Sequence, residues 1–221
     1  MNTKFIKGLF FGIYVLFNSY ADAQTIPVVV IYHQKEIRLT DSISSSDFHI
    51  TNLKFYLSNI RLYKTISLVD EELNSYHLID LLDTSKNKLK LSRNNNMLFD
   101  RIDFNIGIDS LTNVSGAYEG DLDPMNNMYW TWQSGYINLK FEGAIDDEVY
   151  REYHLGGYAY PNNALQKVSL KMNSSGNTII YIHLDDFIKS IPDSIPFKFM
   201  TPDPKAVYLS QLFAKCLSSE K

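Results

Sequence analysis

Short stretches of alternating apolar and polar positions recur along this chain, and each predicts a β-strand with one buried face. The alternation is clearest at 53–58, 99–108 and 136–142. A β-branched run at 28–32 and the segment 76–80 predict two further strands. The chain is therefore expected to be rich in short strands.

Towards the C-terminus, residues 168–172 and 178–184 are expected to pair as a hairpin, with the Asn, Ser and Gly residues of 173–177 as its turn. No Pro/Gly linker divides the chain, so we expect one domain over 24–221. Many strands with turn signals between them predict an all-β fold, an antiparallel β-sandwich with one or two short peripheral helices.

Helical patterns are few. Residues 78–89 are a weak candidate for a short helix. Residues 203–217 are the best candidate, because their apolar positions recur at close to 3.6-residue spacing and Pro204 suits a first helical position.

Residues 1–23 have the pattern of a cleavable signal peptide. Two lysines precede an apolar run at 9–17, and Ala21-Asp22-Ala23 is a small-x-small cleavage site that makes Gln24 the expected mature N-terminus. The run is shorter than the about 20 residues that cross a bilayer. We therefore expect a periplasmic or secreted protein with no membrane span after cleavage.

The charge balance excludes an electrostatic surface for nucleic acid or anionic lipid. The formal net charge is −4, and loss of the two lysines and one aspartate of the signal peptide makes it −5. Cys216 is the only cysteine. An exported chain without a disulfide must be held together by packing.

Both tryptophans, Trp130 and Trp132, lie in one short segment, and Met125 and Met128 precede them. The simplest interpretation is an aromatic core cluster in which methionine fills gaps. The histidine His154 precedes two glycines, His33 ends the first predicted strand, and His77 is ambiguous. A lone histidine is more often structural than functional, so the residues alone do not decide their role.

The common catalytic and cofactor motifs are absent: there is no P-loop, G-x-G-x-x-G, H-E-x-x-H or G-x-S-x-G, and no Cys/His spacing fits zinc. Asp121 and Asp123 weakly suggest calcium, although the Gly and Glu of an EF-hand loop are missing. The same two carboxylates are a weak candidate for hydrolysis, since no histidine or nucleophile accompanies them.

The chain resembles the MbnP family of periplasmic copper-binding proteins, which are related to the surface copper proteins of methanotrophs. The resemblance covers almost all of the mature chain. It rests on a series of blocks: His33 in the first strand, 55–62, 76–80, 104–109, 122–136, 140–143 and 154–157.

The resemblance implies a β-sandwich that binds copper as Cu(I). In that family a tryptophan is oxidised to kynurenine by a partner MbnH-like di-haem enzyme of the MauG/cytochrome-c-peroxidase type, and kynurenine and two imidazoles hold the metal. Carried onto this chain, the histidines are His33 and His154, and the tryptophan is Trp130 or Trp132. Imidazole and thioether donors both suit copper, so Met125, Met128 and His77 are possible additional ligands.

The expected function is therefore copper acquisition, storage or trafficking, without an enzymatic activity of its own. The alternative is a carbohydrate- or peptide-binding module, in which the tryptophans and nearby tyrosines such as Tyr158 and Tyr160 form a stacking platform.

Overall fold

The computed structural model describes residues 24–39, 48–91, 98–131, 134–145, 149–172 and 178–221. The expected signal peptide and the expected turn at 173–177 lie outside these ranges. The strands are β1 (Thr25–Tyr32), β2 (Lys35–Ile37), β3 (Phe48–Lys64), β4 (Ser67–Glu71), β5 (Tyr76–Asp80), β6 (Lys88–Lys90), β7 (Arg101–Ile106), β8 (Tyr129–Thr131), β9 (Gly135–Ile145), β10 (Arg151–Gly156), β11 (Gln166–Lys171), β12 (Ile180–His183), β13 (Lys198–Phe199) and β14 (Leu217–Ser218). The helices are α1 (Ser110–Ser115), α2 (Leu184–Ser190) and α3 (Pro204–Lys215), with the short 3-10 turns η2 (Gly120–Leu122) and η3 (Pro124–Asn126).

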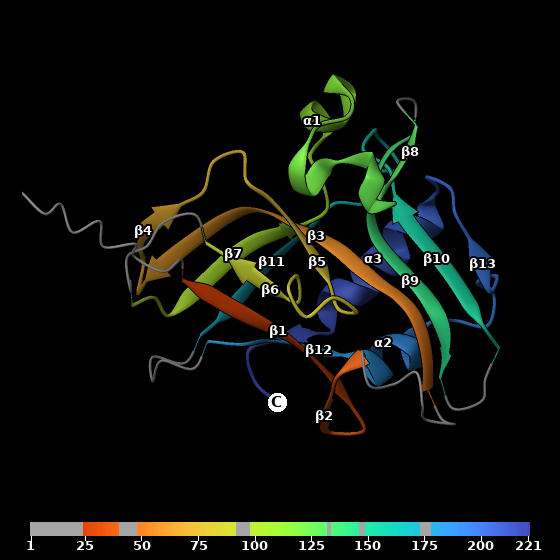
Figure 1. Cartoon of the computed structure of the whole chain (residues 1–221), viewed down its shortest axis with the longest axis horizontal. Coiled ribbons are helices and arrows are strands. Elements are labelled where there is room, and N and C mark those ends of the chain that lie inside the picture. Colours follow the sequence, from red (N-terminus) through yellow and green to blue (C-terminus); the bar gives the residue numbers. More distant parts are fainter. Residues whose placement is uncertain (1–23, 40–47, 92–97, 132–133, 146–148, 173–177) are drawn as a thin grey trace, which may run out of the picture.

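Two sheets build the domain (Figure 1). The smaller has the order β14-β12-β1-β2, with β6 also on β1, and the larger has the order β11-β7-β3-β9-β10-β13, with β4 and β5 on β3 and β8 on β9. The mainly β, sandwich-like fold is confirmed. The sheets are mixed, because β12 runs parallel to β1 and β13 runs parallel to β10.

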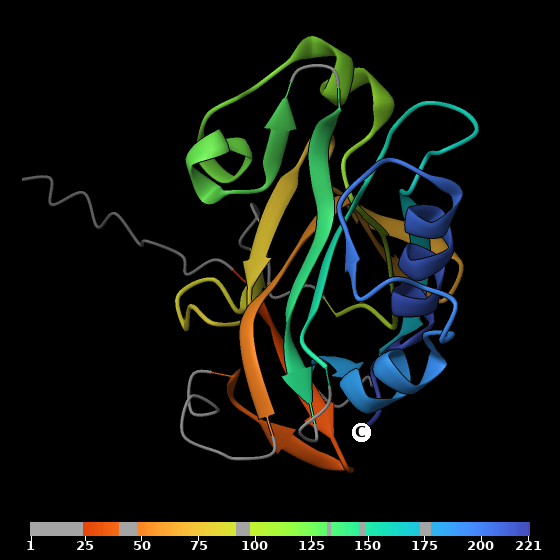
Figure 2. The same ribbon diagram turned by 90° about the vertical axis from the view of Figure 1, so that its right-hand side faces the viewer.

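The main core lies between one face of the larger sheet, the smaller sheet and helices α2 and α3, which lie together along one side of the domain (Figure 2). Phe55 of β3, Phe187 of α2 and Phe213 of α3 are fully buried. The ring centroids of Phe55 and Phe187 each lie 5.4 Å from that of Phe213. Each such ring contributes about 1.5–3 kcal/mol of burial free energy, so packing holds a chain whose single cysteine is a free, buried thiol.

The predicted C-terminal helix is confirmed as α3, with Pro204 in its first turn. Asp203 caps it, because its side chain accepts a hydrogen bond of 2.7 Å from the backbone N–H of Lys205. The cap satisfies one of the unpaired N–H groups at a helix start.

Two sequence predictions are wrong. The hairpin over 168–184 does not form: β11 pairs with β7 and β12 pairs with β1, so the two segments belong to different sheets. Residues 78–89 form no helix, because Asp83 accepts hydrogen bonds from the N–H and hydroxyl of Ser85 and turns the chain from β5 towards β6. The expectation of few, short helices agrees with the described residues, which contain three short α-helices where one or two were expected.

Candidate functional site

The long strand β3 carries two successive partners on each edge. Lys54 and Phe55 pair with both β9 and β5, whereas Leu57 and Ser58 pair with both β7 and β5. Strands β9 and β7 therefore follow one another along the same edge of β3, and they meet at the level of Tyr56.

Gly107 and Asn138 fill this junction. The N–H of Gly107 donates to the carbonyl of Tyr56 at 2.9 Å, and the N–H of Ile108 donates to Oδ1 of Asn138 at 3.1 Å. Gly107 has a φ of +110°, and a Cβ there would lie 2.4 Å from Cγ of Asn138. Both the backbone and the space therefore require glycine.

Asn113 of α1 connects the chain that follows Gly107 to the start of β9. Its Nδ2 donates to the carbonyls of Ile108 and Asp109, at 3.0 and 2.9 Å, and its Oδ1 accepts from the N–H of Tyr136 at 2.8 Å. A buried amide with its bonding capacity used in this way stabilises one arrangement of the backbone.

A second apolar cluster lies on the face of the larger sheet turned away from the main core, called the outer face below. Tyr56 donates its hydroxyl to the carbonyl of Asp121, and Tyr136 donates to that of Leu122, both at 3.0 Å, so η2 is held over the cluster. Its buried members are Tyr56, Leu78, Ile108, Leu122, Met128, Tyr136 and Ile137, with Tyr76, Tyr129 and Trp130 packed at its margin.

From the margin of this cluster, the ring of Trp130 extends to β10. A Cβ on Gly156 would come within 2.9 Å of Cζ3 of the indole and 2.6 Å of the carbonyl oxygen of Tyr136. The absence of a side chain at Gly156 therefore lets the ring approach the strand. Gly156 and His154 both lie on the outer face, because Leu155 between them is buried in the main core. The pairing of β10 with β9 shifts register between Leu155 and Gly156.

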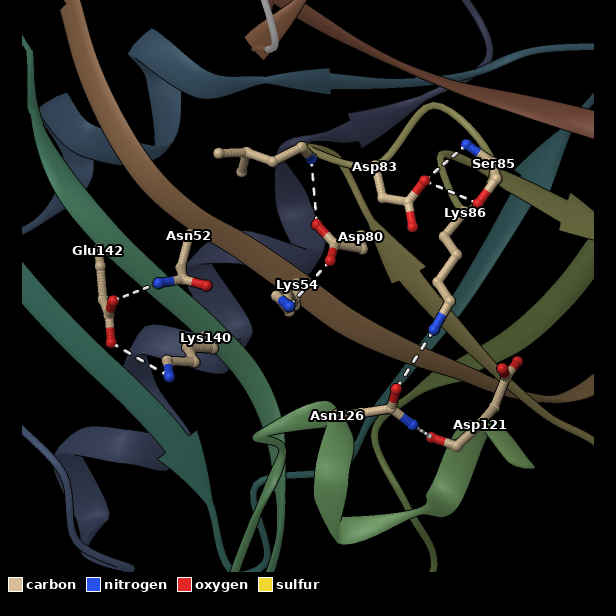
Figure 3. Close-up of polar contacts among 11 residues, drawn as sticks. Asn52, Lys54, Asp80, Asp83, Ser85, Lys86, Asp121, Asn126, Lys140 and Glu142 are labelled. Carbon is tan, nitrogen blue, oxygen red and sulfur yellow. Dashed lines mark hydrogen bonds and ion pairs between the residues drawn. The ribbon is translucent and has the colours of Figure 1, made fainter. Parts of the chain in front are cut away.

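His154 is bound to a carboxylate on the neighbouring strand. Its Nε2 lies 2.6 Å from Oε1 of Glu142. Glu142 also accepts from Nδ2 of Asn52 and lies 3.3 Å from Nζ of Lys140, and Figure 3 shows these two side chains on its two oxygens. The side chains of His154, Glu142 and Lys140 are only 12, 17 and 13% exposed.

Burial sets the electrostatics of this pair. It lowers the pKa of His154, against the opposing effect of the Glu142 hydrogen bond, so the imidazole is neutral at neutral pH. Burial alone raises the pKa of Glu142, but the hydrogen bond from His154, the charge of Lys140 and the bond from Asn52 outweigh it and hold the pKa below its ordinary value. A neutral imidazole beside a carboxylate is the form in which histidine binds a metal.

The structure does not bring His33 to this place. His33 is exposed in the two-residue turn between β1 and β2, with a φ of +47°, and its ring stacks on Tyr32 at 4.2 Å. That turn and β8, which carries Trp130, lie at opposite ends of the domain in both views (Figures 1 and 2). His33 and Trp130 therefore cannot contact one ion in this arrangement.

The other predicted ligands are dispersed. His77 is bound to Glu72, with 2.7 Å between Nε2 and Oε2, whereas Met125 is 84% exposed and Met128 is buried in the outer-face cluster. Trp132 lies outside the described residues.

The carboxylates of Asp121 and Asp123 both accept backbone hydrogen bonds. Asp121 accepts from the N–H of Leu78 at 2.9 Å, and Asp123 accepts from that of Met125 at 2.8 Å as the cap of η3. These bonds give both carboxylates a structural role.

Within the described ranges, no three His, Cys, Asp or Glu side chains form a group suited to a metal ion. No helix in the described part of the chain is long and apolar enough to cross a membrane. Among the described residues, His154 would therefore need a donor of another kind beside it to hold a metal ion on the outer face. The residues present fit a copper site in part. One ring nitrogen of His154 is held by Glu142, and the ring of Trp130 lies against Gly156, two residues along β10 from His154.

The sequence alone gives no role to Glu142, Asn138 or Asn113. The alternation at 136–142 does place Glu142 and Lys140 on the polar face, which is the signal that could have identified Glu142. The roles of the two asparagines depend on a junction between strands that are distant in sequence, and no local pattern indicates it.

Comparisons with known proteins agree with this architecture. The family model for MbnP matches residues 21–192. A solved structure, MbnP from Methylosinus trichosporium, is similar with a TM-score of 0.51 and 12% sequence identity, over 83% of this chain and 86% of that chain. No curated protein matches the sequence. Because the family model spans most of the sequence, this chain belongs to the MbnP family.

Proposed function

We propose that this chain is a copper-binding protein of the periplasm, that His154 is one of its copper ligands, and that Trp130 completes the site. The observation that carries the proposal is the His154–Glu142 pair, with 2.6 Å between Nε2 and Oε1, on the face that Gly156 opens to Trp130. A metal-binding histidine commonly donates its second ring N–H to a carboxylate.

The chemistry of the tryptophan supports the same assignment. The indole N–H only donates a hydrogen bond, so an unmodified Trp130 offers no ordinary ligand atom. Oxidation to kynurenine by a partner di-haem enzyme, as the family resemblance implies, would supply an aniline nitrogen and a carbonyl. Such a group beside His154 would suit Cu(I) together with imidazole.

The position of Trp130 argues against the alternative of a sugar- or peptide-stacking platform. One side of its ring packs on Gly156, and the ring lies at the margin of the outer-face cluster. Tyr160, in contrast, is 98% exposed. A stacking surface needs aromatic faces open to solvent, so metal binding is the function that the geometry favours.

The test is Cu(I) titration of the chain that begins at Gln24, with a competing chromophoric chelator, in the variants His154→Ala and Trp130→Phe. We expect His154→Ala to weaken copper binding by more than about tenfold. His49→Ala is the matched control, because His49 is exposed at the start of β3. His33→Ala is measured beside them and is expected to have the smaller effect.

The modification is tested on the same protein. After coexpression with a di-haem enzyme of the stated class, peptide masses would show oxidation at Trp130 or Trp132. Copper uptake that is unchanged in both His154→Ala and Trp130→Phe would contradict the proposal. Glycan binding that is lost in Trp130→Phe and independent of metal would support the alternative.

A further inference from the structure

We infer that Glu142 is a positioning residue, which fixes His154 in the tautomer protonated at Nε2 and leaves Nδ1 as the atom that binds the metal. The inference rests on the proposed function for its metal, but the tautomer belongs to the copper-free protein. Its basis is the arrangement of three donors around one carboxylate.

The bonding around Glu142 decides which partner donates. Oε2 accepts from the amide of Asn52, and Oε1 lies 3.3 Å from the ammonium of Lys140. A carboxylate that takes an amide and an ammonium acts as an acceptor at both oxygens. The ring nitrogen of His154 at 2.6 Å from Oε1 must therefore carry the hydrogen. In a neutral imidazole this leaves a lone pair on Nδ1.

Nδ1 of His154 has no hydrogen bond within the described ranges, whereas Nε2 has one. It is also absent from the buried atoms that lack a partner in the described chain. Among the described residues, Nδ1 is therefore unpaired and not fully buried.

The supporting side chains are fixed by strand register. His154 lies opposite Lys140, and Asn52 lies opposite Glu142, so three adjacent strands contribute to the arrangement. The same row continues from Lys140 through Lys54 to Asp80, where Nζ of Lys54 lies 2.8 Å from Oδ2 of Asp80 (Figure 3). Each lysine thus has its own carboxylate, and Glu142 stays available to His154.

The experiment is a long-range 1H–15N NMR correlation on the copper-free chain from Gln24, labelled at histidine, with His154 assigned by its absence from His154→Asn. We expect wild type to show a protonated Nε2 and an unprotonated Nδ1. In Glu142→Ala the two tautomers should mix, and Cu(I) affinity should fall by about 10–100-fold. Glu142→Gln keeps an acceptor oxygen, so it should retain the tautomer and most of the affinity.

Glu152→Ala is the matched control. Glu152 lies directly opposite Glu142 on β10 and has its own partner, Lys198, at 2.6 Å. This variant should change neither the tautomer nor copper binding. If Glu142→Ala does not fold, the wild-type spectrum still decides which ring nitrogen of His154 carries the hydrogen.

Two results would overturn the inference: a wild-type His154 protonated at Nδ1, or a tautomer unchanged in a folded Glu142→Ala. Failure of the proposed function has a different signature, namely copper uptake that persists in His154→Ala, whatever the tautomer.

Discussion

The indole ring of Trp130 lies against the backbone of Gly156, so closely that a Cβ there would come within 2.9 Å of Cζ3. The contact joins the segment of β8 to β10, the strand that carries His154. It also explains the first of the two glycines that follow Leu155. The second, Gly157, has a φ of +119° and a carbonyl that accepts from the N–H of Ala164.

The Trp130–Gly156 contact predicts a coupled pair of substitutions. Gly156→Ala should destabilise the fold by about 1–3 kcal/mol through overpacking. In a Trp130→Ala background the same substitution should cost less, because the clash with the ring is gone and only that with the Tyr136 carbonyl remains. Urea unfolding of the four proteins measures the coupling. Equal costs in both backgrounds would show that the ring does not lie on Gly156.

Substituting Gly107 should destabilise the fold more than substituting a glycine whose only special feature is a positive φ. Gly107→Ala meets both a φ of +110° and the side chain of Asn138, whereas Gly116→Ala meets a φ of +99° and no atom within 4 Å. Each should lose about 1–3 kcal/mol from the backbone conformation, and Gly107→Ala should lose more. The comparison uses the free energy of unfolding in denaturant. If Gly116→Ala loses as much unfolding free energy as Gly107→Ala, the contact with Asn138 does not add to the cost at Gly107.

The Tyr76–Asp109 bond predicts an acid dependence of stability. Burial raises the pKa of Asp109, but hydrogen bonds from the Tyr76 hydroxyl and from the N–H and hydroxyl of Thr112 outweigh it, so the pKa is lower than the ordinary 3.8. A carboxylate whose pKa is lower in the folded state than in the unfolded state stabilises the fold at pH values above its unfolded-state pKa. This stabilisation is lost as the pH falls through its folded-state pKa.

Tyr76→Phe removes one of these donors, so the stability of the variant should fall less steeply with acid below about pH 4. Unfolding free energies at a series of pH values test this. Tyr160→Phe, at a 98% exposed position, should keep the wild-type slope. Identical slopes for all three proteins would contradict the assigned bond.

Removing the N-cap of α3 should lower the stability of the fold without affecting the candidate site. Asp203→Ala should cost about 1 kcal/mol, because the N–H of Lys205 loses its acceptor. Asp203→Asn keeps a capping oxygen and should cost much less. Denaturant midpoints give the comparison, and Cu(I) affinity should be unchanged in both variants. An Asn variant as unstable as the Ala variant would mean that the cap is not the cause.

Local patterns in the sequence determined several of the strands and where α3 begins. Alternation at 53–58 and 136–142 is enough to predict β3 and β9, because successive residues of a strand point to opposite faces of the sheet. Both faces are buried there, however, because the outer-face cluster covers Tyr56 and Tyr136. Pro204 and the apolar spacing after it likewise predict the helix. The family blocks also could be recognised from residues alone, and the family is confirmed.

Only the tertiary structure decided which strands pair and which chemical groups meet. The partners of β11 and β12 are β7 and β1, each 60 or more residues away along the chain, and no local turn signal encodes such pairings. His33 and His154 looked equivalent as candidates, yet the fold places Trp130 beside the strand of His154 and leaves His33 in a turn at the other end of the domain. The reason is physical: strand periodicity fixes the face of a residue, whereas its neighbours depend on register between distant strands.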